Sequence, residues 1–152
     1  MTTRVLLVDD APDLRLLGRT VLASAGFTVD EAANGPEALT RLANSHDTDV
    51  VVLDVQMPEM DGWDTLAAIR ANPTTAATRV VLCTVKEHPR DQLRAWELGA
   101  DGYIAKPFAV RDLVDTVSAA ARRDELDRIR VRTAEARVAR RRLAEREERN
   151  EP

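Results

Sequence analysis

Cysteine is almost absent from this sequence of 152 residues, and histidine and lysine are nearly as scarce. The single cysteine, Cys83, excludes a disulfide framework and a cluster of thiolate metal ligands. The two histidines, His46 and His88, have no cysteine, histidine or serine partner at the spacing of a metal site or a catalytic triad. Lys86 and Lys106 are the only lysines among 22 basic residues, so a lysine within a motif is conspicuous here.

Long apolar runs are also missing, and none approaches the roughly 20 residues that span a bilayer. The first ten residues already contain Asp9 and Asp10 and do not have the pattern of a signal peptide. We therefore expect a cytoplasmic protein without membrane contact. The net charge of −4 disfavours nucleic acid as the main partner, because binding to phosphates requires an excess of positive charge.

The charged residues are concentrated towards the C-terminus. Residues 1–123 carry 13 basic and 18 acidic side chains, whereas the much shorter segment 124–152 carries 9 basic and 8 acidic ones. We therefore divide the chain into a globular domain, residues 1–123, and a charged helical extension, residues 124–152. Residues 109–148 contain no glycine or proline and are rich in strong helix formers. This composition predicts one continuous helix across the boundary, projecting from the domain.

The sequence leaves the role of this extension open. A spacing of three and four residues relates Leu126, Ile129, Thr133, Ala136, Arg140 and Leu143. A threonine and an arginine interrupt the stripe, which makes it a poor coiled-coil seam. Helical dimerisation or docking to a partner, a single solvated helix and a fraying tail remain as alternatives.

Within residues 1–123, short apolar runs alternate with helical patterns. Buried parallel strands are expected at 5–8, 50–53 and 80–83, because each run is rich in β-branched residues and apolar on both faces. Weaker strands fit 27–32 and 103–105. The predicted helices run from Pro12 up to Gly26, with Leu14, Leu17, Val21 and Leu22 at helical spacing, and over 36–44, 63–71, 90–98 and 109–123. Five strands alternating with five helices predict a doubly wound α/β domain with a parallel sheet.

Polar residues follow the strands at one predicted edge of this sheet. Asp9 and Asp10 end the first strand, Asp54 ends the third, Thr84 ends the fourth, and Lys106 ends the fifth. In an open parallel sheet, ligands bind just beyond the carboxyl ends of the strands. The sequence therefore predicts three carboxylates, one hydroxyl and one ammonium group around a single site.

Three neighbouring carboxylates repel one another, and a hard divalent cation relieves this repulsion. Mg²⁺ prefers oxygen ligands and is often held by one or two carboxylates together with a phosphate. One of the carboxylates can then act as a nucleophile towards a phosphoryl donor and form an aspartyl phosphate. The ammonium group of Lys106 would neutralise charge on the transferring group.

These residues lie within longer motifs, and the chain resembles the receiver domain of two-component response regulators. The resemblance covers residues 3–122 and rests on Asp9-Asp10, on Asp54 with the following Met57-Pro58-Glu59-Met60-Asp61-Gly62, on Thr84, and on the run from Gly99 to Phe108. It implies a flavodoxin-like sheet of strand order 2-1-3-4-5, here with an extended C-terminal helix and without a separate output domain.

The resemblance also implies the roles of individual residues. Asp54 would accept the phosphoryl group, and Lys106 would pair with it, with a cis peptide bond after Lys106. Asp10 and Asp54 would ligate Mg²⁺ together with the backbone carbonyl of Gln56, while Asp9 would act through a water molecule.

Further residues are implied to read and tune the site. Thr84 and Tyr103 would form a switch pair that remodels the surface of the fourth helix, fifth strand and fifth helix. Gln56 and Lys86 occupy the two positions that control attacking water in this family, and both are long and polar.

We therefore expect a response regulator that takes its phosphoryl group from a sensor histidine kinase or a phosphotransfer protein and signals to a downstream protein. It would catalyse its own phosphorylation and dephosphorylation without being an enzyme in the usual sense. A homodimer through the C-terminal helix, or through the surface of the fourth helix, fifth strand and fifth helix, is left open. The alternatives are a phosphorelay intermediate and a Mg²⁺-dependent phosphohydrolase; Gln56 argues against the latter, which needs an acidic residue there.

Overall fold

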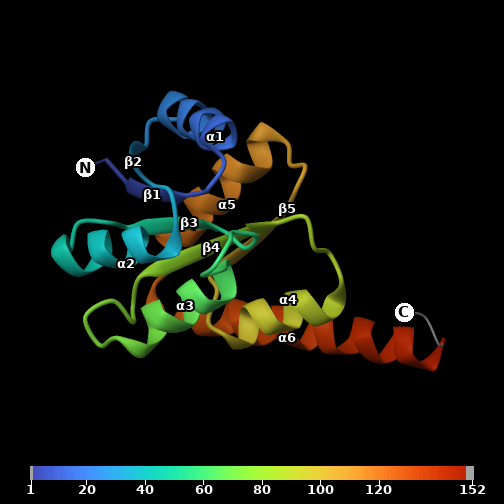
Figure 1. Ribbon diagram of the computed structural model, residues 1–152. Coiled ribbons are helices and arrows are strands. Elements are labelled where there is room, and N and C mark those ends of the chain that lie inside the picture. The colour runs from blue at the N-terminus through green and yellow to red at the C-terminus, as the bar shows by residue number, and fades with distance from the viewer. Residues whose placement is uncertain (1, 150–152) are drawn as a thin grey trace.

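Five parallel strands form the centre of the protein, for which a computed structural model describes residues 2–149. The strands are β1 (Arg4–Val8), β2 (Thr28–Ala32), β3 (Val50–Asp54), β4 (Arg79–Thr84) and β5 (Gly102–Ala105). The helices are α1 (Pro12–Ser24), α2 (Gly35–Asn44), α3 (Gly62–Ala71), α4 (Pro89–Glu97), α5 (Val110–Arg122) and α6 (Glu125–Glu148). The sheet order is β2-β1-β3-β4-β5, which confirms the predicted α/β fold (Figure 1).

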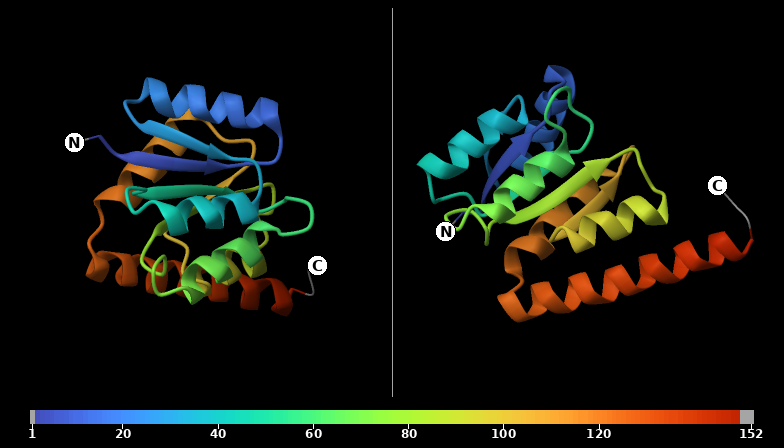
Figure 2. Two further views of the ribbon diagram at one scale, coloured as in Figure 1. Left: turned by 60° about the vertical axis from the view of Figure 1, so that its left-hand side comes forward. Right: turned by 60° about the horizontal axis from the view of Figure 1, so that its bottom comes forward.

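Helices cover both faces of the sheet, so its central strands are buried on both sides. All five residues of β3 are buried. Val5 and Val52 face α1 and α5, whereas Leu6 and Leu53 face the apolar cluster shared with α2, α3 and α4. Figure 2 shows the helices on the two faces of the sheet. Among residues 2–149, no helix is both long enough and apolar enough to cross a bilayer.

The helix is interrupted between α5, which ends at Arg122, and α6, which begins at Glu125. The prediction of one continuous helix across residue 123 is therefore wrong. Arg123 takes an extended conformation, with φ −71° and ψ 134°, and ends α5. The side chain of Asp124 then accepts a hydrogen bond from the Asp127 N–H and caps a new helix. A capping aspartate therefore starts a second helix here without any glycine or proline.

Helix α6 does not project from the domain either, because it turns back and packs along α4 (Figures 1 and 2). Ala136 and Ala139 are buried, whereas Leu126 and Ile129, which share the interrupted stripe with Ala136, are about half exposed. A partner helix is thus supplied by the same chain. The last residues of the extension, 150–152, lie outside the described residues.

A buried carboxylate anchors the start of α6. Asp101, 2% exposed, lies just before β5 and accepts hydrogen bonds from the side chains of Arg128 (Nε–Oδ1 2.7 Å), Arg132 (Nη2–Oδ1 2.9 Å) and Arg70 (Nη2–Oδ2 3.0 Å). Burial by itself raises the pKa of Asp101, but hydrogen bonds from Arg128 and the Val80 N–H, with the charges of Arg132 and Arg128, outweigh it and lower the pKa. The carboxylate therefore stays ionised and ties α3, β4 and α6 together.

We predict that Asp101→Asn lowers the free energy of unfolding by about 3 kcal/mol, because it leaves buried arginines without their counter-charge. Urea denaturation measures this loss. In the wild type the stabilisation is complete above the ordinary carboxyl pKa of about 3.9, and it is lost as pH falls towards the lower folded-state pKa. In Asp101→Asn the free energy of unfolding should lack this decrease at low pH.

The matched control is Glu97→Gln, which removes the ion pair between Glu97 and Arg140. Both side chains of this pair are more than half exposed and their charged atoms are 3.6 Å apart, so the expected loss is below about 1 kcal/mol. Equal losses in the two variants would contradict the anchoring role of Asp101.

Candidate functional site

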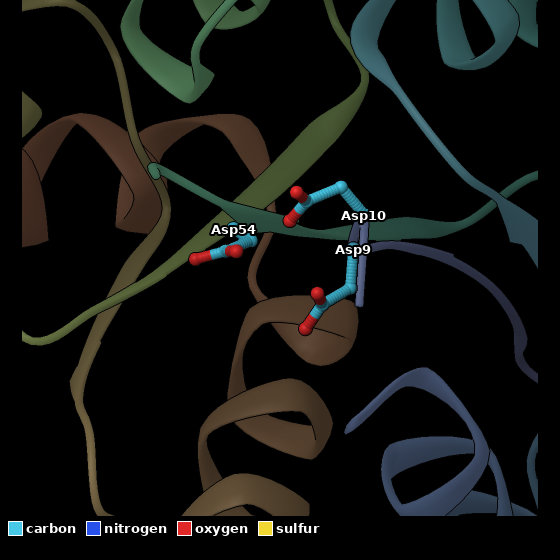
Figure 3. Close-up of side chains that lie close together, drawn as sticks. All are labelled: Asp9, Asp10 and Asp54. Carbon is cyan, nitrogen blue, oxygen red and sulfur yellow. The ribbon is translucent and has the colours of Figure 1, made fainter. Parts of the chain in front are cut away.

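Three carboxylates lie together at the carboxyl edge of the sheet, as the sequence predicted. Asp9 and Asp10 follow β1, and Asp54 ends the neighbouring strand β3. Oxygen atoms from the three side chains lie within 4.8 Å of one another, and Figure 3 shows the side chains next to each other. Asp9 and Asp54 are each 6% exposed, whereas Asp10 is exposed.

Lys106 joins this cluster from the end of β5. Its Nζ lies 3.3 Å from Asp54 Oδ1 and 3.5 Å from Asp9 Oδ2. Its backbone N–H donates to the Thr84 carbonyl at 2.7 Å, and the following peptide bond is cis, as the resemblance implied. Burial lowers the pKa of Lys106, but the carboxylates of Asp54 and Asp9 outweigh it and raise the pKa, so the side chain is a cation at neutral pH.

Asp54 is held in a crowded and partly desolvated place. Burial raises the pKa of its carboxyl group, and the neighbouring Asp9 adds to this, while the charge of Lys106 opposes it. The loop after β3 is tight, since the Gly62 N–H donates to the Val55 carbonyl at 2.8 Å. A Cβ atom at Gly62 would lie 2.6 Å from the Asp54 carbonyl oxygen, so only glycine lets α3 begin this close to the site.

Asp9 is fixed by contacts that the sequence analysis did not identify. Its Oδ1 accepts a hydrogen bond from the Ala11 N–H at 2.9 Å, and its backbone carbonyl accepts one from Arg15 Nη1 at 2.7 Å. Arg15 lies one turn into α1. Its position shortly after the Asp9-Asp10 pair was the only feature of the sequence that could have indicated this contact. These bonds direct one oxygen of Asp9 to the backbone and leave the other near Lys106.

The expected switch residues are connected through Lys86 in the loop between β4 and α4. Thr84 is fully buried, and its Oγ1 accepts a hydrogen bond from the Lys86 N–H at 3.1 Å. The hydroxyl of the half-buried Tyr103 donates to the Lys86 carbonyl. The side chains of Lys86 and Gln56 are exposed, and the Gln56 N–H lies 3.4 Å from Asp54 Oδ1. One loop residue thus links Thr84 to Tyr103.

Residues 5–118 match the family model described as "Response regulator receiver domain". The chain belongs to this family. Among curated proteins, the transcriptional regulatory protein CpxR of Escherichia coli is 41% identical over 120 residues, which are 79% of this chain and 50% of that protein. Protein PilG of Pseudomonas aeruginosa is 30% identical over 116 residues, 76% of this chain and 85% of PilG.

Solved structures agree with this assignment. The chemotaxis response regulator CheY4 of Vibrio cholerae superposes with a TM-score of 0.74 at 31% identity, covering 79% of this chain and 99% of that one. A response regulator receiver domain protein from Clostridium thermocellum gives a TM-score of 0.75 at 26% identity, covering 82% of this chain and 98% of that one.

The match to the receiver domain does not extend over the whole chain or over whole relatives. This chain spans about half the length of the transcriptional regulators that it matches. The family match ends at residue 118, inside α5, so α6 lies outside it. The anchoring arginines Arg128 and Arg132 are therefore features of this chain that the family match does not explain.

The carboxylates of this receiver domain fit a magnesium ion. All three donors are hard oxygen ligands, as Mg²⁺ requires, and the exposure of Asp10 leaves room for the water molecules that Mg²⁺ usually retains. Burial, and after it the charge of Asp9, raises the pKa of Asp54, and a bound cation would oppose both effects. Lys106 is the only ammonium group near the three carboxylates among residues 2–149.

An apolar cleft of about 290 Å³ opens beside the carboxylates, between α1 and the loop after β5. Asp54 and Lys106 line it, and Leu14, Leu17 and Phe108 form part of its walls. Leu14 and Leu17 are more than half exposed. Their helical spacing was used to predict the helix, and in this part of α1 the two leucines form a surface next to the site.

We predict that Mg²⁺ stabilises the folded protein and that this effect depends on Asp10. At ten times the dissociation constant of the wild type, Mg²⁺ should raise its free energy of unfolding by about 1.4 kcal/mol. Asp10→Asn should lose most of this increment, because one hard ligand is removed. Urea denaturation in Mg²⁺ and in a chelator measures it for each variant.

Asp13→Asn is the matched control, since Asp13 is exposed in the first turn of α1 and outside the cluster of three carboxylates. It should keep the full increment. An increment that is the same in Asp10→Asn and in the wild type would show that the ion does not bind at these carboxylates.

Proposed function

We propose that this receiver domain accepts a phosphoryl group on Asp54 from a phosphorylated histidine of a sensor kinase, in a Mg²⁺-dependent reaction, and signals through protein contacts. The observation that supports it most is the meeting of Asp9, Asp10 and Asp54 with Lys106 at one edge of the sheet. The proposed phosphoryl transfer modifies the protein itself and releases no altered substrate, so its role is regulatory. A cytoplasmic location is part of the proposal.

The transfer follows from the arrangement of these groups. An Oδ atom of Asp54 attacks phosphorus while the bond from phosphorus to the histidine nitrogen breaks, and the bonding electron pair stays on the imidazole, which takes up a proton. Desolvation makes the Asp54 carboxylate a stronger nucleophile, and Lys106 keeps it ionised and then pairs with a phosphoryl oxygen. Asp10 and Asp54, with the Gln56 carbonyl and with Asp9 through water, would hold Mg²⁺, which would supply positive charge next to the phosphoryl group.

The hydrogen bonds at Lys86 suggest how the modification is read. Thr84 Oγ1 accepts from the Lys86 N–H, and its O–H would donate to a phosphoryl oxygen on Asp54, which would draw the side chain towards Asp54. If Thr84 turns to the phosphoryl group, the loop at Lys86 moves with it, and Tyr103, whose hydroxyl donates to the Lys86 carbonyl, turns inward. The change would then reach the surface of α4, β5 and α5. The exposed side chains of Gln56 and Lys86 would set how fast water attacks the phosphoaspartate.

The apolar cleft beside Asp54 is suited to hold the kinase during transfer. A histidine-bearing helix needs an apolar surface next to the acceptor, and Leu14, Leu17 and Phe108 provide one. Asp54 lines this cleft, so a partner docked there would present its phosphorylated residue to the carboxylate.

We predict that a small phosphodonor with Mg²⁺ adds ~80 Da to the wild type, as intact-mass spectrometry detects. Asp54→Asn should gain no mass, because it lacks the nucleophilic oxygen. Lys106→Met should react much more slowly, while Asp13→Asn should behave as the wild type. No added mass on the wild type would refute the proposed function, and continuous release of phosphate from simple phosphate esters would favour a phosphohydrolase.

We also predict that Leu17→Ser slows phosphotransfer from a sensor kinase at least about 10-fold while leaving modification by the small phosphodonor unchanged, because it removes docking surface and not chemistry. Leu16→Ser is the matched control: Leu16 is equally exposed on α1 but does not line the cleft. The measurement uses any phosphorylated kinase that modifies the wild type. Equal slowing by the two variants would contradict docking in the cleft.

A further inference from the structure

The link between α5 and α6 consists of two residues in a stretch of sequence that favours a helix. Arg123 and Asp124 are extended, with ψ angles of 134° and 175°, and they separate helices of 13 and 24 residues. Residues 109–148 nevertheless contain no glycine or proline, and the alanine, arginine, leucine and glutamate around the link are strong helix formers. The local sequence is therefore compatible with one continuous helix through the link.

A few contacts hold the link in its extended form. The side chain of Asp124 accepts a hydrogen bond from the Asp127 N–H at 2.8 Å and caps α6. The Arg123 carbonyl accepts one from Arg79 Nη2 at 2.7 Å, and Arg123 Nη1 donates to the Asp101 carbonyl at 2.7 Å. A continuous helix would replace these contacts by backbone hydrogen bonds, because it pairs the carbonyls at the end of α5 with the N–H groups at the start of α6.

The surface on which α6 docks lies outside the link. Arg128 and Arg132 bind the buried carboxylate of Asp101. Further along, α6 packs on α4 (Figures 1 and 2), and its small residues Ala136 and Ala139 are 6% and 2% exposed. A second copy of the chain carries the same arginines and alanines in the same register. Its α6 can therefore make the same contacts with this surface.

We propose that two copies of this chain exchange α6, so that α6 of each copy docks on α4 and Asp101 of the other. In the exchanged form, α5 and α6 of each copy form one continuous helix through Arg123 and Asp124. The contacts of α6 are the same in the closed monomer and in the exchanged dimer, so the balance between them depends on the link and on the protein concentration. This inference concerns assembly and does not depend on the chemistry at Asp54.

The link sets the concentration at which exchange occurs. A short link holds α6 next to its own α4 at an effective concentration on the order of 1 mM. Exchange at lower protein concentrations requires that the continuous helix be more stable than the extended link. Substitutions within the link therefore shift the dissociation constant of the dimer, whereas a dimer formed through another face would not respond to them.

Two substitutions in the link act in opposite directions. Asp124→Ala removes the cap from both monomers and favours a continuous helix, so it should lower the dissociation constant of the dimer at least about 10-fold. Glu125→Pro should abolish the dimer. Proline fits the first position of α6, where the preceding Asp124 is already extended, but it interrupts a continuous helix. The matched control is Glu125→Ala, which removes the ion pair from Glu125 to Arg128 without interrupting a helix.

Light scattering of the full chain at concentrations up to about 1 mM measures the dimer, after circular dichroism has shown that each variant is folded. The exchange predicts that Asp124→Ala dimerises at lower concentrations than the wild type, that Glu125→Ala dimerises like the wild type, and that Glu125→Pro stays monomeric. Monomers throughout this range for both the wild type and Asp124→Ala, or a dimer that persists in Glu125→Pro, would overturn the exchange.

Cross-linking shows whether α6 of one copy lies on α4 of the other. Glu97 of α4 and Arg140 of α6 form an ion pair of 3.6 Å. Glu97→Cys chains and Arg140→Cys chains, mixed and equilibrated, should be joined between positions 97 and 140 by a short bifunctional thiol reagent. Cys83, 4% exposed, is too buried to compete. Arg141→Cys is the matched control, because Arg141 is also exposed but points to another side of α6. Equal yields from the two mixtures would overturn the exchange and leave the proposed function intact.

Discussion

The ion pairs of the Lys106 ammonium group with Asp54 and Asp9 are the interaction on which the site depends. A parallel sheet brings the carboxyl ends of its strands to one edge, and here that edge collects Asp9, Asp10 and Asp54 within 4.8 Å. Burial and mutual repulsion both work against the ionised form of such a cluster. Lys106 offsets part of this cost, at 3.3 Å from Asp54 and 3.5 Å from Asp9. The negative charge that Lys106 leaves uncompensated favours a bound cation at this edge.

The opposite end of β5 shows the same physics with the charges reversed. Asp101 precedes this four-residue strand and Lys106 follows it, so each end of β5 has a buried or half-buried ion cluster. The carboxylate of Asp101 accepts hydrogen bonds from three arginines. Other N–H groups of these arginines donate to backbone carbonyls, as Arg132 does to Ala100. That cluster is closed and structural, whereas the cluster at Lys106 has an exposed carboxylate and an open cleft beside it. The Asp101 cluster therefore holds parts of the fold together, whereas the Lys106 cluster has room for a ligand.

Much of this could be predicted from the sequence, and the reason is local. Apolar β-branched runs fix the strands, and the polar residues directly after them must meet at the carboxyl edge, which places Asp9, Asp54 and Lys106 without any knowledge of side-chain packing. The strand order and the cis bond after Lys106 came with the family resemblance, and both are present. The roles of Asp10, Gln56, Thr84, Tyr103 and Lys86 remain part of the proposed function.

The course of α6 could not be predicted in this way, because it depends on contacts between distant residues. Helix propensity is high throughout residues 109–148, and it does not reveal that Asp124 caps a second helix. Arg128 and Arg132 lie on one face of α6, but their spacing does not identify Asp101 as the carboxylate that they share. The exposed Leu14 and Leu17 show a similar limit, since a helical apolar stripe has the same spacing whether it is buried or exposed.

The central claim is that Asp54 carries the phosphoryl group, and reductive trapping tests it most directly. Borohydride reduces an aspartyl phosphate to homoserine, which is stable and can be located by peptide mass spectrometry. After treatment of the full chain with a small phosphodonor and Mg²⁺, the account predicts homoserine at position 54, and none at this position when the phosphodonor is omitted. Homoserine at position 9 or 10, or none at any aspartate, would contradict it.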